Sequence, residues 1–513
     1  MLSKIYSMGI FGIDGYMVSV ECNIRNKLFA FDIVGLPDAA IKESKERVRS
    51  AYENSGFEFP DMEITVNLAP ADKKKEGSAL DLAILVAIMK SAGVINPELN
   101  TDKMCFSGEL SLSGELHGTN GFLPMCIAAR DAGMKEIYVP CDKAAESAVV
   151  DGVIIYPVPN VAALVAHLNG EELIEPKKPD EAVFDRTNNY AGLDFEDVKG
   201  QLFAKRALEV ACAGGHNVLL IGPPGTGKSM LSKRIPTILP EMTFEEALET
   251  TKIHSVAGMM KPGVSLITER PFRAPHHTMS SAGLAGGGKI PTPGEISLAH
   301  GGVLFLDELP EFNRSVLEVM RQPLEDRKIS VARANYKVDY PAGVMFVASM
   351  NPCPCGYYNH PTKACVCNPG QVQRYLNRIS GPLLDRIDLQ IEIVPVPFEK
   401  ISDAREGEPS AAIRERVIAA RKIQEERFKD EEGIYCNAQM TPRLSSRYAV
   451  IDDTCRTLLR TAMNRFNLSA RAYDRIVKVA RTIADLEASE NIQSHHIAEA
   501  IGYRNLDRES WGV

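Results

Sequence analysis

The spacing of hydrophobic positions divides the chain into blocks, and the first block mixes strand-like and helix-like patterns. The runs GYMVSVECNI (15–24), EITVNLAP (63–70) and EIYVP (136–140) are rich in β-branched and aromatic residues, which is typical of strands. The segment GSALDLAILVAIMKSAG (77–93) is a long apolar run and predicts a helix. We therefore predict a first domain of mixed strands and helices over residues 1–170.

A second block follows a polar, charged and proline-bearing segment, residues 171–190, which predicts a linker. In residues 191–400, short apolar runs alternate with helical stretches. The apolar runs lie at 216–222, 301–309, 342–351 and 389–396. Apolar strands separated by helices are typical of a parallel sheet covered by helices on both faces. This domain is therefore predicted to have an α/β fold.

The third block, residues 401–513, has a helical pattern throughout. In SARAYDRIVKVARTIADLE (469–487), the residues Tyr473, Ile476, Ala480 and Ile483 fall on one stripe of a helix. We expect this stripe to face a core and the block to form a helical domain.

Composition narrows the class of protein. No apolar run approaches the roughly 18 residues of a membrane span. The amino terminus reaches Asp14 after a short apolar stretch and does not resemble a secretory signal, so the eleven cysteines are expected in a reducing cytoplasm. The 58 lysines and arginines are outnumbered by 67 acidic residues, for a net charge of −9. Any contact with nucleic acid is therefore expected from local basic loops.

The sequence GPPGTGKS follows the apolar run 216–222 and precedes a helical stretch, as a phosphate-binding loop does. Its glycines allow backbone N–H groups to point at phosphates, its lysine reaches the outer phosphates, and its serine hydroxyl binds Mg²⁺. The predicted nucleotide-binding residues are Gly222, Pro223, Pro224, Gly225, Thr226, Gly227, Lys228 and Ser229.

A second motif completes the predicted site. In GGVLFLDELPEF (301–312), a short apolar run is followed by two carboxylates. Asp307 is placed to hold the Mg²⁺ shell, and Glu308 is placed to polarise the attacking water. A strand that merely meets an acidic turn would look similar, but this one follows a complete phosphate-binding loop. We therefore predict ATP hydrolysis with Mg²⁺.

Four cysteines gather in NPCPCGYYNHPTKACVC (351–367). Cys353, Cys355, Cys365 and Cys367 form two C-x-C arms, and four thiolates can close a tetrahedral zinc site. An iron–sulfur cluster also accepts four thiolates, and a loop of free thiols is a third interpretation. We favour structural Zn²⁺.

The ordered motifs GPPGTGKS, GGVLFLDELPEF, MNPC, GPLLDRIDL and LSARAYDRIVKVARTIADL resemble those of magnesium-chelatase-like AAA+ ATPases, and most closely the ComM and YifB family. The resemblance covers essentially the whole chain and implies a helical lid after the ATPase core. It matches Asn351 to sensor 1, Arg386 to the arginine finger and Arg471 to sensor 2. A finger that acts on the neighbouring subunit implies a hexameric ring, although either arginine alone could form a plain surface ion pair.

Two basic insertions accompany these motifs. Residues 269–302 are expected to form a long mobile loop, and residues 326–344 a hairpin; in related ring motors, both elements face a central pore and grip nucleic acid. Ordinary solvated charges would look similar, but such residues could contact phosphates without sequence preference. The residues concerned are Arg270, Arg273, His276 and His277 in the loop and Arg327, Lys328, Arg333 and Lys337 in the hairpin.

The first domain resembles the proteolytic domain of Lon proteases, an α+β fold of the ribosomal S5 domain 2-like type. Aligned on Lys75 and Gly77, the position of the nucleophilic serine holds Ala79, and the position of the catalytic lysine holds Leu123. Ser78 has no amine partner to activate it. We expect a scaffold or a DNA-facing platform in place of a protease.

The resemblance implies a homohexameric DNA motor that drives branch migration or unwinding during recombination in natural transformation, with recombination proteins as further partners. A chelatase-type motor for metal insertion and a protein-remodelling ATP switch are the alternatives. The cysteine cluster begins two residues after Asn351 and ends before the segment that carries Arg386. A metal clip there would stiffen the connection between these two residues.

Overall fold

The computed structural model describes residues 2–70, 75, 77–180, 192–288, 291–333, 336–358, 360–396, 407–431, 433–466 and 468–504. The chain divides into two compact units. Unit 1 comprises Met1–Thr187 and Phe244–Thr268, and unit 2 comprises Asn188–Thr243 and Glu269–Val513. Across the described residues, no helix combines the length and the apolar character that a membrane crossing requires.

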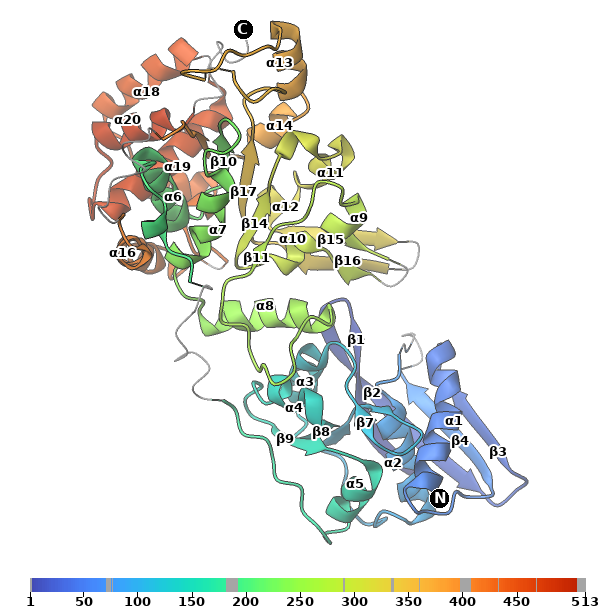
Figure 1. Ribbon diagram of the computed structural model, residues 1–513. Coiled ribbons are helices and arrows are strands. Elements are labelled where there is room, and N and C mark those ends of the chain that lie inside the picture. Colours follow the sequence, from blue (N-terminus) through green and yellow to red (C-terminus); the bar gives the residue numbers. More distant parts are fainter. Residues whose placement is uncertain are drawn as a thin grey trace. The chain divides into compact units, whose positions relative to one another are not determined.

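Unit 1 is built on a seven-stranded mixed sheet (Figure 1). In sheet order, the strands are β3 (Ala30–Val34), β4 (Glu63–Ala69), β2 (Asp14–Arg25), β1 (Leu2–Phe11), β5 (Met104–Phe106), β8 (Glu136–Pro140) and β9 (Ile154–Val158). In chain order, the helices of residues 1–187 are α1 (Ala39–Asn54), α2 (Asp81–Ala92), α3 (Phe122–Asp131), α4 (Ala144–Ser147) and α5 (Val161–Leu168). The three predicted strands and the predicted helix are confirmed.

Helix α2 is the centre of the core of unit 1. Every residue from Leu82 to Met89 is fully buried, because this helix is apolar on all sides. It ends at Gly93, whose φ of 83° is a left-handed conformation that favours glycine.

Helix α8 (Phe244–Val256) comes from the middle of the chain but belongs to unit 1. Leu248 packs against the cluster that contains Phe122 and Met125, and the carbonyl of Ser255 accepts a hydrogen bond from the N–H of Gly121 at 3.0 Å. The two units therefore cut the chain differently from the three predicted domains, which had placed this helix with the ATPase core.

Unit 2 contains a five-stranded sheet in which all neighbouring strands are parallel (Figure 1). In sheet order, the strands are β11 (Phe272–Arg273), β14 (Val303–Leu306), β17 (Met345–Met350), β10 (Val218–Ile221) and β18 (Leu389–Glu392). All residues of β10, β14 and β17 are buried, as their apolar sequences require. The carboxyl ends of these three strands meet at one edge, and the predicted α/β fold is confirmed.

Helices and a hairpin surround this sheet. They are α6 (Leu202–Gly214), α7 (Lys228–Ile238), α9 (Ser281–Ala285), α10 (Glu295–Leu298), α11 (Arg314–Val319), α12 (Pro323–Asp326), α13 (Pro369–Leu376) and α14 (Gly381–Leu384), with the antiparallel pair β15 (Lys328–Arg333) and β16 (Tyr336–Pro341). The predicted hairpin is confirmed.

The carboxyl-terminal helices share one hydrophobic core with α6, β10 and β18. They are α16 (Ser410–Phe428), α17 (Pro442–Tyr448), α18 (Asp453–Phe466), α19 (Ala470–Leu486) and α20 (Ser494–Gly502). On α19, Ile476, Ala480 and Ile483 are buried as expected. Tyr473 is 39% exposed, so its predicted place on the buried stripe is wrong; it lies in the first turn, before the part of the helix that the core covers.

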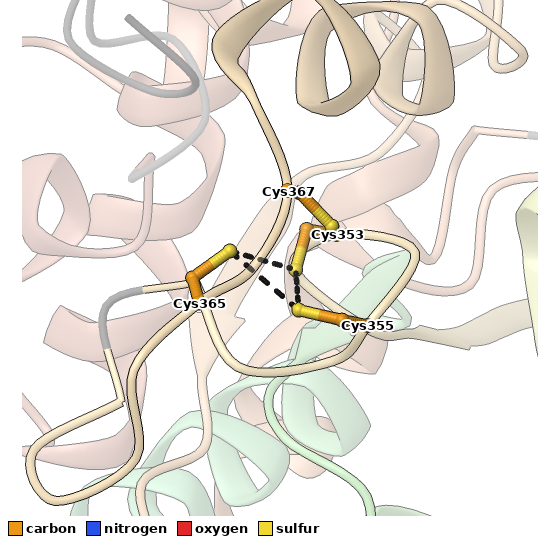
Figure 2. Close-up of side chains that lie close together, drawn as sticks. All are labelled: Cys353, Cys355, Cys365 and Cys367. Atoms are coloured by element: carbon orange, nitrogen blue, oxygen red, sulfur yellow. Dashed lines mark hydrogen bonds between the residues drawn. The ribbon is translucent and has the colours of Figure 1, made fainter.

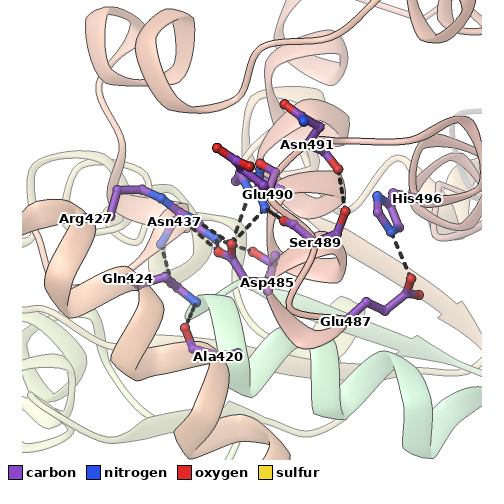
Figure 3. Close-up of polar contacts among 12 residues, drawn as sticks. Ala420, Gln424, Arg427, Asn437, Asp485, Glu487, Ser489, Glu490, Asn491 and His496 are labelled. Carbon is purple, nitrogen blue, oxygen red and sulfur yellow. Dashed lines mark hydrogen bonds and ion pairs between the residues drawn. The ribbon is translucent and has the colours of Figure 1, made fainter.

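A buried carboxylate fixes the helices of this lid to one another (Figure 3). Asp485 on α19 is 2% exposed. Its Oδ2 accepts hydrogen bonds from Arg427 Nη1 on α16 at 2.7 Å and from Asn437 Nδ2 at 2.7 Å. Arg481, one turn earlier, donates to Oδ1 at 3.1 Å. Because its charge is compensated on several sides, this carboxylate can be buried at low cost.

We expect Asp485→Ala to lower the free energy of unfolding of unit 2 by about 3–5 kcal/mol, because it leaves buried guanidinium groups without their partner. Urea titration measures this loss. Asp474→Ala is the matched control, since Asp474 lies on the same helix, is 38% exposed in its side chain and pairs only with Lys478 among the salt bridges described. The control should lose about 0–1 kcal/mol. Equal losses in the two variants would contradict the assigned role of Asp485.

Candidate nucleotide-binding site

The predicted phosphate-binding loop lies between β10 and α7, at the carboxyl edge of the parallel sheet. It borders a cavity of about 410 Å³. The cavity is lined by Pro224, Gly225, Thr226, Gly227, Lys228, Ser229, Met230, Asp307, Glu308, Ser349, Met350 and Asn351. The ends of β10, β14 and β17 therefore bring together the loop, both carboxylates and Asn351, as the sequence predicts.

The backbone of the loop fits phosphate groups. Gly225 and Gly227 have φ angles of 80° and 88°, a left-handed conformation that glycine adopts without strain. The loop leads directly into α7, an 11-residue helix that begins at Lys228. The unpaired N–H groups of a helix amino terminus favour anions.

Lys228 supplies the positive charge of the cavity. Its side chain is buried, and Nζ donates to the carbonyls of Gly222 at 2.7 Å and Pro223 at 2.9 Å and to Asn351 Oδ1 at 3.2 Å. Burial lowers the pKa of Lys228, and the nearby charges of Asp307 and Glu308 oppose this shift. All three hydrogen-bond acceptors are neutral, so an anionic phosphate would be a stronger partner for this ammonium group.

Asp307 is oriented by hydrogen bonds from helix α7, from strand β17 and from its own loop. Its Oδ2 accepts from Ser229 Oγ at 2.8 Å, and its Oδ1 accepts from Ser349 Oγ and from the N–H of Glu308 at 3.0 Å. A hydroxyl and a carboxylate side by side are ligands that suit Mg²⁺. Sequence reasoning missed Ser349, although it lies on β17 two residues before Asn351, which directly follows the strand, and this spacing favours the same side of the sheet for both side chains.

Glu308 has a different environment from Asp307. Its φ of 53° is unusual for a residue with a side chain, and the side chain is 56% exposed. The His277 Nδ1 atom lies 3.7 Å from Glu308 Oε2. His277, which the sequence places in a basic insertion, therefore lies next to Glu308, the carboxylate that we predict to polarise water.

Arg386 and Arg471 do not line the cavity of their own chain. Arg386 is largely buried: its Nη1 donates to the carbonyl of Pro382 at 2.7 Å, and its Nη2 pairs with Glu325 on α12. The Arg471 Nη1 atom lies 3.1 Å from Asp385 Oδ2, one residue before Arg386. The predicted finger and the predicted sensor 2 therefore lie close to each other, and apart from the phosphate-binding loop.

The four cysteines of 351–367 converge (Figure 2). The Sγ atoms of Cys353, Cys355 and Cys365 lie 3.3, 3.7 and 3.5 Å apart, and all four sulfurs lie within 4.8 Å of one another. These separations are too long for a disulfide and close to the edge of about 3.8 Å in a tetrahedral zinc–thiolate site. The cluster is therefore compatible with zinc.

Hydrogen bonds from the loop backbone favour ionisation of one thiol of the cluster. Burial opposes ionisation of Cys355, but N–H groups of Tyr357 and Val366 point at its sulfur and, with Cys353 and Cys367, lower its pKa to about 6. Burial raises the pKa of Cys365 and Cys367, so the shifts favour the thiolate form that metal ligation requires at Cys355 alone among these three.

The basic insertions differ from the expectation. Residues 269–302 contain β11, α9, α10 and the short strands β12 (Gly286–Gly287) and β13 (Thr292–Pro293), which corrects the prediction of a long mobile loop. Arg270 donates to the carbonyls of Pro240 and Gly301, and Arg273 forms a bidentate pair with Glu295.

In the hairpin, Arg327 donates to the carbonyls of Gly433 and Gln439. Lys328 and Lys337 are exposed, as is His276 in the first insertion. The side chain of Arg333 lies outside what the structure describes. Arg270, Arg273 and Arg327 therefore have structural roles. Among the described basic side chains of the two insertions, Lys328, Lys337 and His276 are exposed to solvent.

In unit 1, the Lon-like positions contain no assembled nucleophile. Ala79 and Leu123 are buried, and Ser78 Oγ donates to Glu109. Lys75, also buried, donates through Nζ to the carbonyl of Pro70.

Comparison with known proteins identifies the family. The family model "Magnesium chelatase, subunit ChlI" matches residues 194–401, "Subunit ChlI of Mg-chelatase" matches 20–143, and "Magnesium chelatase, subunit ChlI C-terminal" matches 407–504. The chain is 42% identical over 511 residues to the competence protein ComM of Haemophilus influenzae, covering 99% of this chain and 98% of that protein. The chain belongs to the ComM and YifB family of magnesium-chelatase-like AAA+ ATPases.

Two further matches support the assignment to the ComM and YifB family and the Lon-like character of the first domain. YifB of Salmonella typhimurium is 42% identical over 510 residues, covering 99% of this chain and 98% of that protein. Lon protease 2 of Bacillus subtilis is 30% identical over 155 residues, which is 28% of this chain and 27% of the protease. The predicted family and the Lon-like similarity are confirmed.

We expect Lys228→Ala and Glu308→Gln to separate binding from hydrolysis. Lys228→Ala removes the buried charge that faces the phosphates and should weaken nucleotide binding at least about tenfold. Glu308→Gln keeps the shape of the site and should leave the nucleotide Kd nearly unchanged while lowering kcat about 100-fold or more. Fluorescent-nucleotide titration and phosphate release measure the two quantities. A Glu308→Gln variant with normal turnover would refute the assigned role.

Proposed function

We propose that this chain is an ATP-driven motor that forms a homohexameric ring and moves branched or single-stranded DNA during recombination of incoming DNA. The observation that carries this proposal is the separation of the two arginines from their own cavity, combined with similarity along the full chain to a competence protein. We infer the ring and the movement of DNA from these features and from the chemistry of phosphoryl transfer.

Within one chain, the site has the groups that bind MgATP but lacks a second cation. Lys228 faces the outer phosphates, Ser229 and Asp307 hold Mg²⁺, and Glu308 orients the water, with Asn351 beside Lys228. Phosphoryl transfer places negative charge on the equatorial oxygens, and a guanidinium group stabilises it. Among the lining residues of the cavity, none is an arginine.

Arg386 and Arg471 can supply this charge to a neighbouring chain. Arg471 pairs with Asp385, the residue before Arg386, so the two arginines come from the same part of the molecule. Arg386 would leave its pair with Glu325 to act on another chain. A head-to-tail contact would place this part of the molecule against the cavity of the next chain, and such contacts close into rings. In this arrangement, both arginines act across the interface, so Arg471 does not act on the ATP of its own chain.

Mixing two inactive variants tests the shared site. Lys228→Ala has a defective nucleotide site but keeps Arg386, and Arg386→Ala keeps the nucleotide site but lacks the finger. Each variant alone should retain less than about 1% of activity, whereas random mixing restores a complete site at about a quarter of the interfaces of a ring. Steady-state ATPase measures the recovery.

The control for this experiment replaces the first variant with the double variant Lys228→Ala/Arg386→Ala, which has no finger to lend. Size-exclusion chromatography establishes that each variant assembles. Absence of recovery in mixed, assembled rings would refute a shared site, as would full activity of the wild-type chain as a monomer.

The hairpin of β15 and β16 is the part of the ATPase unit best suited to contact DNA. Its buried face, which includes Val331, Val338 and Tyr340, fixes it to the rest of the unit, and Tyr340 donates to the carbonyl of Pro291 at 2.8 Å. Its other face presents the exposed lysines Lys328 and Lys337. A rigid element with exposed lysines can follow a phosphate backbone without reading its sequence.

We expect Lys337→Ala to weaken binding to branched DNA and to reduce the dependence of log K on log salt by about 1. ATPase activity without DNA should remain unchanged, because the hairpin does not line the cavity. Lys422→Ala removes the same charge from an exposed position on α16 and is the matched control. Equal hydrolysis with and without branched DNA in the wild type would refute a DNA motor.

A chelatase-type motor is the second candidate, because three family models of a magnesium chelatase subunit match the chain. That function predicts hydrolysis that is indifferent to DNA, so the same measurement separates the two candidates.

We also propose that Cys353, Cys355, Cys365 and Cys367 bind one Zn²⁺ ion per chain. The support is the convergence of four sulfurs on two arms, with backbone N–H groups directed at Cys355. Four thiolates in a closed site are typical of structural zinc.

A further inference from the structure

The turn that joins Cys353 and Cys355 packs against the phosphate-binding loop. The N–H of Gly356 donates to the carbonyl of Cys353 at 3.0 Å, which closes the turn. Gly356 has a φ of 84°, and a Cβ atom at this position would lie 2.7 Å from Cδ of Pro224 and 3.3 Å from its Cγ. Only glycine therefore fits between the cysteine turn and Pro224.

The cysteine segment and the phosphate-binding loop also border the same small cavity. Pro352, Tyr358 and Pro361 line it together with Gly222 and Pro223, and its volume is only about 10 Å³. This volume is at the lower limit for one water molecule, so little space separates the residues that line it.

The described residues of 351–367 form turns and bends but no helix or strand. Regular backbone hydrogen bonding therefore does not hold this segment in place. Its two ends meet at the cysteine side chains. The Sγ atom of Cys365 lies 3.7 Å from Sγ of Cys353 and 3.5 Å from Sγ of Cys355. Cross-linking distant positions through a metal removes much of the conformational freedom of such a loop.

We propose that the metal held by these cysteines sets the geometry of the nucleotide site. A bound thiophilic divalent cation fixes the Gly356 turn against Pro224 and holds Asn351, two residues before Cys353, beside Lys228. Loss of the metal releases this contact and weakens nucleotide binding as well as hydrolysis. This inference rests on the proposed zinc site and on nucleotide binding at the cavity.

The first test removes the metal from the full-length protein. Cys365→Ser/Cys367→Ser should reduce zinc from one equivalent per chain to none, by elemental analysis, and weaken the affinity for a fluorescent ADP at least tenfold. Cys141→Ser changes an exposed cysteine outside the cluster and should change neither quantity. Full affinity in a folded, metal-free double variant would overturn the coupling.

The second test keeps the metal and disturbs the contact. Gly356→Ala should retain one zinc per chain and yet weaken ADP binding, because the new methyl group displaces Pro224. Gly433→Ala is the matched control: Gly433 also has a positive φ, 73°, but nothing lies within 4 Å of its added Cβ. Thermal unfolding of both variants measures the backbone strain that they share. Unchanged ADP affinity in Gly356→Ala would overturn the coupling.

The outcomes distinguish this inference from the proposals beneath it. Wild-type protein without zinc, or with zinc unaffected by the cysteine substitutions, refutes the zinc site. Wild-type protein that holds zinc but binds no ADP refutes the nucleotide site. Zinc and ADP binding that vary independently in the variants refute only the coupling.

Discussion

The buried ammonium group of Lys228 is the charge on which the arrangement of the ATPase unit depends. A charge in a buried position needs hydrogen-bond acceptors, and here they come from the loop itself and from Asn351, which directly follows β17. The loop must therefore curl around the lysine, which requires its glycines, and β17 must lie next to β10. The parallel sheet provides this adjacency.

A second buried charge connects the lid, the sheet and the finger segment. Asp388, two residues after Arg386, accepts a hydrogen bond from the N–H of Asn217 at 2.9 Å and pairs with Arg475 of the lid. Burial opposes its ionisation, but Arg475, His216 and the N–H of Asn217 outweigh this effect and hold its pKa well below the ordinary value. A shift of the lid would thus disturb the residues next to the finger.

The features predictable from sequence were those encoded by neighbouring residues. The buried strands were visible as apolar runs, and Asp307 and Glu308 were visible because they follow one. The roles of Arg270, Arg273 and Arg327 were not, because a carbonyl or carboxylate far along the chain decides whether an arginine is available. The hydrogen bond of Ser349 to Asp307 and the packing of α8 in unit 1 also depend on residues far along the chain, so they could be recognised only in the structure.

The membership of α8 in unit 1 has a practical consequence for dissecting the protein. The backbone passes from one unit to the other after residues 187, 243 and 268, so no single cut separates them. A fragment that starts at residue 188 would contain α8 but not the residues of unit 1 against which Leu248 packs. A fragment that stops at residue 187 would contain those residues but lack α8. Each fragment would expose additional apolar surface to water, so truncating the polypeptide at residue 187 or 188 is expected to promote aggregation.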